Sequence, residues 1–183
     1  MSATSAPRSF VVEPGDKVTP VTAYLAQGMI RGQLVCREVI RVSSWLRTPG
    51  LPDYAGLYDV TFTRTVGTGE PQVLELPEIH LPVAQIMALH LTPPAADPLD
   101  YDPNEQNRKL EPITAISGPF RFDGLLRLPG HLTVAKQMGL LREPFLMLYE
   151  VSVTSAFEPA QSVKVPMVLL RPGACAFAPG NAR

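Results

Sequence analysis

The chain reads Leu-Tyr-Asp-Val-Thr-Phe-Thr at residues 57–63, and the segment returns as Leu-Tyr-Glu-Val-Ser-Val-Thr at residues 148–154, 91 positions later. Four of these seven positions are identical and the other three are conservative. Apolar and polar side chains alternate in the first segment, which predicts a half-buried strand with Tyr58, Val60 and Phe62 on its inner face. The second segment keeps the same phase, so we expect Tyr149 to occupy the place of Tyr58.

The similarity extends along the chain on both sides of these segments. Residues 19–35 match residues 111–127 at a shift of 92, with five identities at Pro20, Thr22, Ala23, Gly32 and Leu34. Residues 76–79 and 165–168 follow in the same order. A long period with only two copies predicts a duplicated module. We therefore divide the chain into an extension (1–17), a first copy (18–92), a Pro/Asp-rich linker (93–110), a second copy (111–178) and a tail (179–183).

Each copy is predicted to contain five strands and one short helix, in the order β-β-α-β-β-β. The first two strands, at 21–26 and 29–36, form a hairpin that turns near residues 27–28, and the second copy turns near 118–119. Val42 and Leu46 lie four residues apart, as Val134 and Met138 do, which places each pair on one face of a short helix. The remaining strands are expected at 73–81 and 83–91, and at 163–170 and 174–177.

Two glycines are predicted to have structural roles together with Tyr58 and Tyr149. Gly32 and Gly124 occupy equivalent places in the second strand of each copy, where a missing side chain allows a bulge or the close passage of another strand. Short strands with a bent second strand favour closure, since closure removes exposed edges. The predicted fold class is therefore mainly β, with two tandem small β-barrel-like modules related by internal duplication.

The Gly-containing step of the second strand, Arg-Gly-Gln-Leu at 31–34 and Asp-Gly-Leu-Leu at 123–126, resembles the start of an Sm-like barrel. It is also similar to short bacterial proteins built from one such unit. Sm-like proteins hold RNA bases with an Asp and an Asn just after this glycine, and residues 35–39 and 127–131 contain neither. The resemblance therefore implies a barrel fold for each copy and carries no RNA site over to this chain.

Composition limits the classes of function. Of the 183 residues, 45% are hydrophobic, and the 16 Lys and Arg residues nearly balance the 17 Asp and Glu residues. This gives a folded core without the broad positive field of a dedicated nucleic-acid binder. No stretch is long and apolar enough to span a membrane, and the start lacks the pattern of a secretory signal, so we expect a cytoplasmic protein without membrane contact. Cys36 and Cys175 are expected to be small buried apolar residues.

Few residues suggest chemistry. His80, His90 and His131 lack the spacing of metal ligands and are expected to be exposed or fully hydrogen-bonded. Residues 100–111 place Asp100, Asp102, Asn104 and Glu111 at calcium-loop positions, but Glu105 stands where such a loop needs glycine, so a semi-rigid linker is the preferred interpretation. Ser43 and Ser44 have no activating partner, and there is no phosphate-binding glycine motif. We predict no enzyme activity, no cofactor and no metal.

Trp45 is the main candidate for an interface. It is the only tryptophan, it lies near Arg41 and Arg47, and its counterpart in the second copy is Gln137, so the module does not need it. Trp and Arg are enriched at protein interfaces, although packing of Trp45 onto the core is the simpler alternative.

The leading hypothesis is a non-enzymatic interaction or assembly module that binds a protein partner or a second copy through Trp45, Arg37, Arg41 and Arg47. Weak nucleic-acid binding by Arg37, Arg41, Arg47, Arg121 and Arg127 is the alternative. A small-molecule enzyme in a cleft between the two copies is a third hypothesis, because residues distant in sequence can meet there.

Overall fold

The computed structural model describes residues 11–48, 50, 52–64, 71–156 and 158–180. Residues 1–10 of the predicted extension and residues 181–183 of the predicted tail lie outside the described residues. The first half of the chain contains β1 (Asp16–Leu25), β2 (Gly28–Arg37), α1 (Val42–Trp45), β3 (Tyr54–Arg64), β4 (Gln72–Pro82), the 3-10 turn η1 (Val83–Gln85) and β5 (Ala88–Leu91).

The second half repeats this order of elements. It contains β6 (Arg108–Ser117), β7 (Phe120–Pro129), α2 (Val134–Leu140), β8 (Leu146–Ser155), β9 (Glu158–Leu170), η2 (Pro172–Ala174) and β10 (Ala176–Pro179). The predicted element order is therefore confirmed in both halves, with the helix between the second and third strands. Strand ends differ from the predicted ones by a few residues, and β1 begins five residues earlier than expected, at Asp16.

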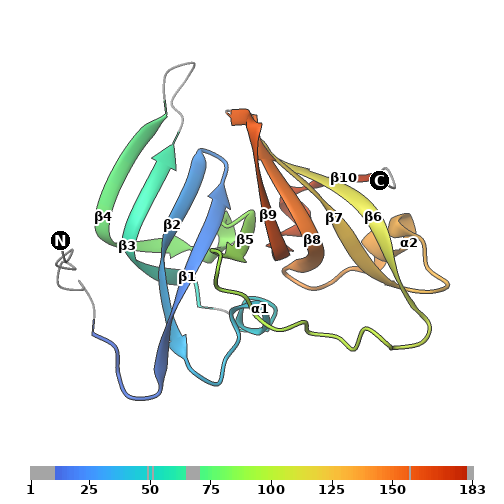
Figure 1. The fold of residues 1–183 in the computed structure, drawn as a ribbon, viewed down its shortest axis with the longest axis horizontal. Helices are drawn as coiled ribbons and strands as arrows, with labels where there is room; N and C mark the ends of the chain where they lie inside the picture. The colour runs from blue at the N-terminus through green and yellow to red at the C-terminus, as the bar shows by residue number, and fades with distance from the viewer. Residues whose placement is uncertain (1–10, 49, 51, 65–70, 157, 181–183) are drawn as a thin grey trace.

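The ten strands form one antiparallel sheet in the order β10-β6-β7-β8-β9-β5-β1-β2-β3-β4. Among the described residues the sheet is open, and its terminal strands β4 and β10 lie on opposite sides of the molecule (Figure 1). Closed barrels were predicted, and the pairing of β5 explains the difference. One edge of β5 pairs with β1 and the other with β9, so β5 joins the two halves instead of closing the first one.

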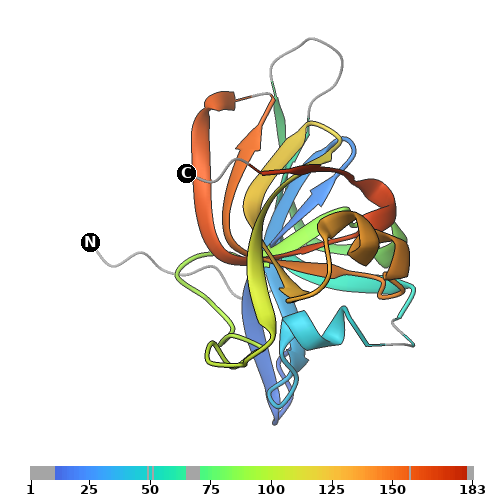
Figure 2. The same cartoon turned by 90° about the vertical axis from the view of Figure 1, so that its right-hand side faces the viewer.

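The two halves also share their strand registers. Val21 lies opposite Gly32 in the β1-β2 pair, and Ile113 lies opposite Gly124 in the β6-β7 pair. Strands β3 and β4 pair in the same register as β8 and β9, with Val60 opposite Leu76 and Val151 opposite Val165. The turned view in Figure 2 shows that the strands cross steeply, as expected for a strongly twisted sheet.

A β-bulge occupies the same place in each half. Two residues of β3, Asp59 and Val60, lie opposite the single residue Gly32 of β2, and Asp59 has a φ of 48°. In the second half Glu150, with a φ of 51°, lies opposite Gly124. A Cβ at Gly32 would lie 3.1 Å from the carbonyl oxygen of Tyr58, and one at Gly124 would lie 3.0 Å from that of Tyr149. The predicted close passage at both glycines is confirmed.

The bulge corrects the predicted alternation of the third strand. An extra residue reverses the side-chain phase, so Leu57 and Val60 are both buried while Asp59 between them is exposed. Tyr58 is half-buried, although it was predicted on the inner face. In the second half Tyr149 is buried as predicted, next to the equally buried Leu148.

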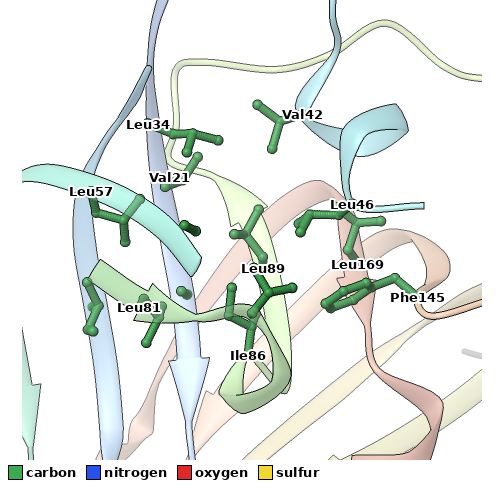
Figure 3. Packing of buried hydrophobic residues seen from close by; sticks show 14 of the residues in the cluster. Val21, Leu34, Val42, Leu46, Leu57, Leu81, Ile86, Leu89, Phe145 and Leu169 are labelled. Carbon is green, nitrogen blue, oxygen red and sulfur yellow. The ribbon is translucent and has the colours of Figure 1, made fainter. Parts of the chain in front are cut away.

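The hydrophobic core consists of two clusters, and each takes side chains from both halves. Phe145 and Leu169 of the second half pack with Leu46, Ile86 and Leu89 of the first (Figure 3). In return, Tyr24, Met87 and Ala88 belong to the cluster formed mainly by the second half. The shared clusters fix the two halves against each other.

The two helices pack as their spacing predicted. Val42 and Leu46 are fully buried in the first cluster. Val134 and Met138 of α2 are half-buried and contact the second cluster. Neither described helix has the length and apolar character needed to cross a bilayer.

The connector between the halves, residues 92–107, is held by specific contacts. Asp97 accepts hydrogen bonds from the backbone N–H and the hydroxyl of Ser43 at the start of α1. Asp100 accepts one from Arg47 at 2.6 Å and one from the hydroxyl of Tyr149 at 2.5 Å. The predicted solvated linker is therefore fastened to both halves, because its acidic residues meet donors from each.

Candidate binding cleft between the two halves

The structure places Trp45 at the margin of the core. Its side chain is half-buried and contacts the first cluster, which fits the packing alternative considered from the sequence. Arg41 immediately precedes α1 and is exposed. The candidate interface of Trp45 with Arg37, Arg41 and Arg47 therefore includes a tryptophan that also serves the core.

Most of the arginines proposed for partner or nucleic-acid binding are engaged in ion pairs. Arg37 contacts Asp16 at 3.2 Å, and Arg47 bridges Asp100 at 2.6 Å and Glu143 at 3.0 Å. Arg121 pairs with Asp123 at 2.8 Å, and Arg127 pairs with Glu105. These contacts neutralise four of the five arginines within the molecule. In the described part of the chain, the five therefore do not form a cluster of unpaired positive charge.

A partly open cleft of about 140 Å³ lies between the two halves. The β1-β2 hairpin and the β8-β9 pair, labelled in Figure 1, both contribute residues to its lining. The first half contributes Thr22, Tyr24, Gly28, Met29, Arg31, Thr63, Pro71, His90, Thr92 and Pro93, and the second contributes Phe120, Val153, Thr154, Ser155, Gln161 and Val163. No short segment of sequence contains this set, so the site exists only when both halves are joined.

The floor of the cleft carries a buried Tyr-His pair. The hydroxyl of Tyr24 lies 3.0 Å from Nε2 of His90, and Nδ1 of His90 lies 2.8 Å from the carbonyl oxygen of Leu91. A carbonyl can only accept, so Nδ1 carries the proton and donates it, and Nε2 accepts the hydrogen bond from Tyr24. Both nitrogens of His90 are therefore satisfied, as predicted for a buried histidine.

Burial keeps this pair neutral. Desolvation lowers the pKa of His90 and raises the pKa of Tyr24, because the charged form of either group would lose its hydration. The nearby positive charge of Arg31 further lowers the pKa of His90. Beside the pair, the hydroxyls of Thr22 and Thr92 lie 2.7 Å apart, so one of them donates a hydrogen bond to the other.

The walls of the cleft are mostly apolar. The ring of Tyr24 meets Phe120 edge-on, with ring centres 4.7 Å apart, and Val153 and Val163 lie opposite each other on β8 and β9. Met29 adds a flexible thioether on the first half. The cleft therefore offers apolar surface above a polar floor in which Tyr24 and His90 are already hydrogen-bonded.

Arg31 is the only charged side chain among the described residues that line the cleft. It is exposed, and it lies across the strands from Thr22 on one side and Thr61 on the other. Side chains that are directly opposite share one face of a sheet, so Arg31 borders the floor at its open side. It forms no ion pair with any described residue, in contrast to Arg37, Arg47, Arg121 and Arg127.

Arg171 links the second half to the first. Its guanidinium donates to the carbonyl oxygens of Ile86 at 2.9 Å and Val83 at 2.5 Å. Its backbone N–H donates to the carbonyl oxygen of Met87. The guanidinium also stacks over the ring of Phe145, 4.6 Å from its centre. These contacts bind carbonyls in and just after η1 and hold the first half against the second.

A second hollow, on the second half, offers a poorer site. Its lining includes Arg121, Asp123, Glu150 and Lys164 on β7, β8 and β9. Arg121 and Asp123 form an ion pair there, and Asp123 also accepts a hydrogen bond from Thr114 at 2.6 Å. The opposite charges within this hollow leave little net potential for a ligand.

The other candidate groups stay apart. His80 is exposed beside Glu78, Cys36 and Cys175 are half-buried where full burial was predicted, and His131 lies before α2. The described residues contain no group of three or more His, Cys, Asp or Glu side chains that could hold a metal ion. The carboxylates at the calcium-loop positions form internal hydrogen bonds. Asp100 accepts from Arg47 and Tyr149, and Asp102 accepts from the N–H of Asn104.

Sequence reasoning missed the roles of Tyr24, Arg31 and Met29. All three lie on the predicted β1-β2 hairpin, which brings them together, but His90 and the opposite wall reach them only through β5 pairing with β1 and β9, which no local pattern specifies. No protein-family model, curated protein or solved structure matches this chain. The function is therefore argued from the cleft itself.

Proposed function

We propose that this protein is a non-enzymatic binding module and that the cleft between its halves is the binding site. The observation that carries the proposal is the construction of the cleft, whose walls come from both halves and whose junction is fixed by Arg171 and the β5-β9 pair. A fixed, mostly apolar hollow with a few polar groups is the usual form of a small-ligand site.

We infer that the halves are duplicated copies of one module, at about 18–92 and 111–178. This inference is supported by their equal element order and by the matching registers at Gly32 and Gly124. A duplicated pair places a cleft between copies without a second chain, and later substitutions in either copy can then shape its two walls separately.

The absence of enzyme activity is part of the same proposal. His90 has both nitrogens in hydrogen bonds, and burial raises the pKa of Tyr24, so neither group is ready to transfer a proton near neutral pH. Ser43 donates to Asp97 at the start of α1, away from the cleft residues. These groups therefore serve packing and polarity.

A protein partner on the surface around Trp45 stays a prediction, and so does nucleic-acid binding by the arginines. The ion pairs of Arg37, Arg47, Arg121 and Arg127 do not favour the nucleic-acid alternative, because a phosphate would have to compete with internal carboxylates.

The test is a titration of the isotope-labelled protein with neutral benzyl alcohol, followed by two-dimensional amide NMR. We expect saturable shifts at residues of both walls, around Met29 and Val153. The variant Val163→Phe fills the cleft from a position that is 40% exposed, and it should abolish these shifts. Ile116→Phe adds the same ring at a 50% exposed position that does not line the cleft, and it should leave them unchanged. Shifts confined to the region of Trp45 and Arg41, or no saturable shifts, would overturn the proposal.

A further inference from the structure

We propose that the cleft binds a small monocarboxylic acid whose apolar body is about the size of one ring, with the carboxylate held by Arg31. This inference rests on the proposed binding function and adds the chemical class of the ligand. It follows from the size of the cleft, the charge at its open side and the neutrality of its floor.

Size limits the ligand to a small molecule. The cleft encloses about 140 Å³. An apolar protein cavity of about 150 Å³ holds one benzene ring, so a single ring or a branched chain of similar volume fits here. Met29, Phe120 and Val163 supply the apolar surface for such a body. A ring placed among them needs no hydrogen-bond partner.

Charge selects the sign of the ligand. Arg31 is the only charged group among the described lining residues, and no described carboxylate pairs with it. The acid in the same cross-strand row is Glu75, which lies beyond Thr61 and accepts a hydrogen bond from the Thr61 hydroxyl at 3.1 Å. A guanidinium without a counterion can take a carboxylate through two parallel hydrogen bonds, whereas it repels an amine.

The floor determines how the acid is oriented. The hydroxyl of Tyr24 donates its hydrogen bond to His90, and Nδ1–H of His90 donates to the carbonyl oxygen of Leu91. Neither group can therefore donate to a carboxylate. A carboxylate pushed onto this pair would lose its hydration without gaining a donor from either residue. The ring therefore enters the cleft, and the carboxylate stays at the exposed side with Arg31.

The experiment compares benzoate, benzamide and benzylamine as probes of nearly equal shape in NMR titrations at low salt. We expect benzoate to bind at least about tenfold more tightly than benzamide, as expected for one hydrogen-bonded charge pair, and benzylamine to bind most weakly. Added salt should reduce the advantage of benzoate, because the pair lies at the exposed side.

Arg31→Gln tests the role of the arginine, and Arg41→Gln is the matched control. Both residues are exposed, and each substitution removes one positive charge, but Arg41 does not line the cleft. We expect Arg31→Gln to reduce benzoate affinity to that of benzamide while benzamide binding is kept, and Arg41→Gln to change neither. Equal melting temperatures of the two variants would confirm that both fold.

The outcomes separate this inference from the proposed function. Equal binding of benzoate and benzamide in the cleft, or an equal loss in both variants, would overturn the carboxylate proposal and leave the binding site in place. Failure of all three probes to shift cleft residues would overturn both.

Discussion

The hydroxyl of Tyr24 donates a hydrogen bond to Nε2 of His90 across two neighbouring strands, and both side chains are only 3% exposed. Tyr24 comes from β1 and His90 from β5, 66 positions later in the chain. Because β5 pairs with strands of both halves, loss of this hydrogen bond tests both the junction and the floor of the cleft.

Loss of the Tyr24 hydroxyl should destabilise the protein. In Tyr24→Phe, Nε2 of His90 keeps its burial but loses its donor, and we expect the free energy of unfolding to fall by about 1–3 kcal/mol. The matched control is Tyr54→Phe at a 57% exposed position, which should change stability by less than about 0.5 kcal/mol. Urea unfolding followed by circular dichroism measures both, and equal stability of the two variants would contradict the role of the pair.

Stability should fall as the solution becomes mildly acidic. Burial lowers the pKa of His90 in the folded state, whereas the pKa of a histidine in the unfolded chain is about 6.5. Between these two values the unfolded chain binds more protons than the folded chain, so stability is fully present above the unfolded pKa and decreases as the pH falls below it.

The measurement is the free energy of unfolding from about pH 7.5 to about pH 5.5, a range that brackets the pKa of an unfolded histidine. His90→Gln should flatten the dependence on pH, whatever its effect on absolute stability. If His90→Gln leaves the slope of the parent protein, His90 does not carry the effect.

Arg171 should contribute strongly to the junction. Arg171→Leu removes the donor to the Ile86 carbonyl and one of the two donors to the Val83 carbonyl, which keeps the N–H of Ile86, so we expect a loss of about 1–3 kcal/mol in unfolding experiments. The control is Arg142→Leu, because Arg142 is exposed and donates only to carbonyls at the end of α2. Equal effects at the two positions would show that Arg171 does not hold the halves together.

The two equivalent glycines should tolerate no side chain. In Gly32→Ala and Gly124→Ala the new Cβ would lie within 3.1 Å of the backbone or a valine methyl of the bulged strand, and we expect each to cost about 1–3 kcal/mol. Gly139→Ala on α2 meets open space and should be neutral or stabilising by up to about 1 kcal/mol. Thermal unfolding of the three variants tests the bulge geometry, and a neutral result at Gly32 and Gly124 would contradict it.

Trp45 distinguishes core packing from surface recognition. Its half-buried contact with the first cluster predicts that Trp45→Ala lowers stability by about 1–3 kcal/mol. Leu140→Ala, at a 62% exposed position on α2, should have an effect below about 0.5 kcal/mol. An unchanged melting temperature for Trp45→Ala would contradict the packing role and favour Trp45 as a surface contact for a protein partner.

Several features of the fold could be predicted from local sequence. Strand and helix positions followed from the alternation at residues 57–63 and from the spacing of Val42 and Leu46, because side-chain periodicity reflects which face of an element is buried. The repeated glycine predicted a close approach, since only a missing Cβ leaves that space. The phase error at Tyr58 arose because a bulge adds one residue to a strand without changing the composition that periodicity measures.

The candidate site could not be predicted in the same way. Arg31 and Arg47 look alike in sequence, yet Arg47 is neutralised by Asp100 and Glu143, which lie 53 and 96 positions away, and Arg31 has no such partner among the described residues. Exposed charges pair according to which loops and strands arrive beside them, and a single segment does not contain this information.

The sequence by itself therefore determined the mainly β character and the order of elements in each half, which depend on local side-chain periodicity, and it marked the two glycine positions, because glycine alone lacks a Cβ. Tertiary structure decided how the halves meet. The choice of β9 as the second partner of β5 opened the sheet, joined the cores and placed the wall of the second half opposite Tyr24, His90 and Arg31. Backbone hydrogen bonds at a strand edge are alike for every sequence, so burial of the side chains of both halves selects this pairing.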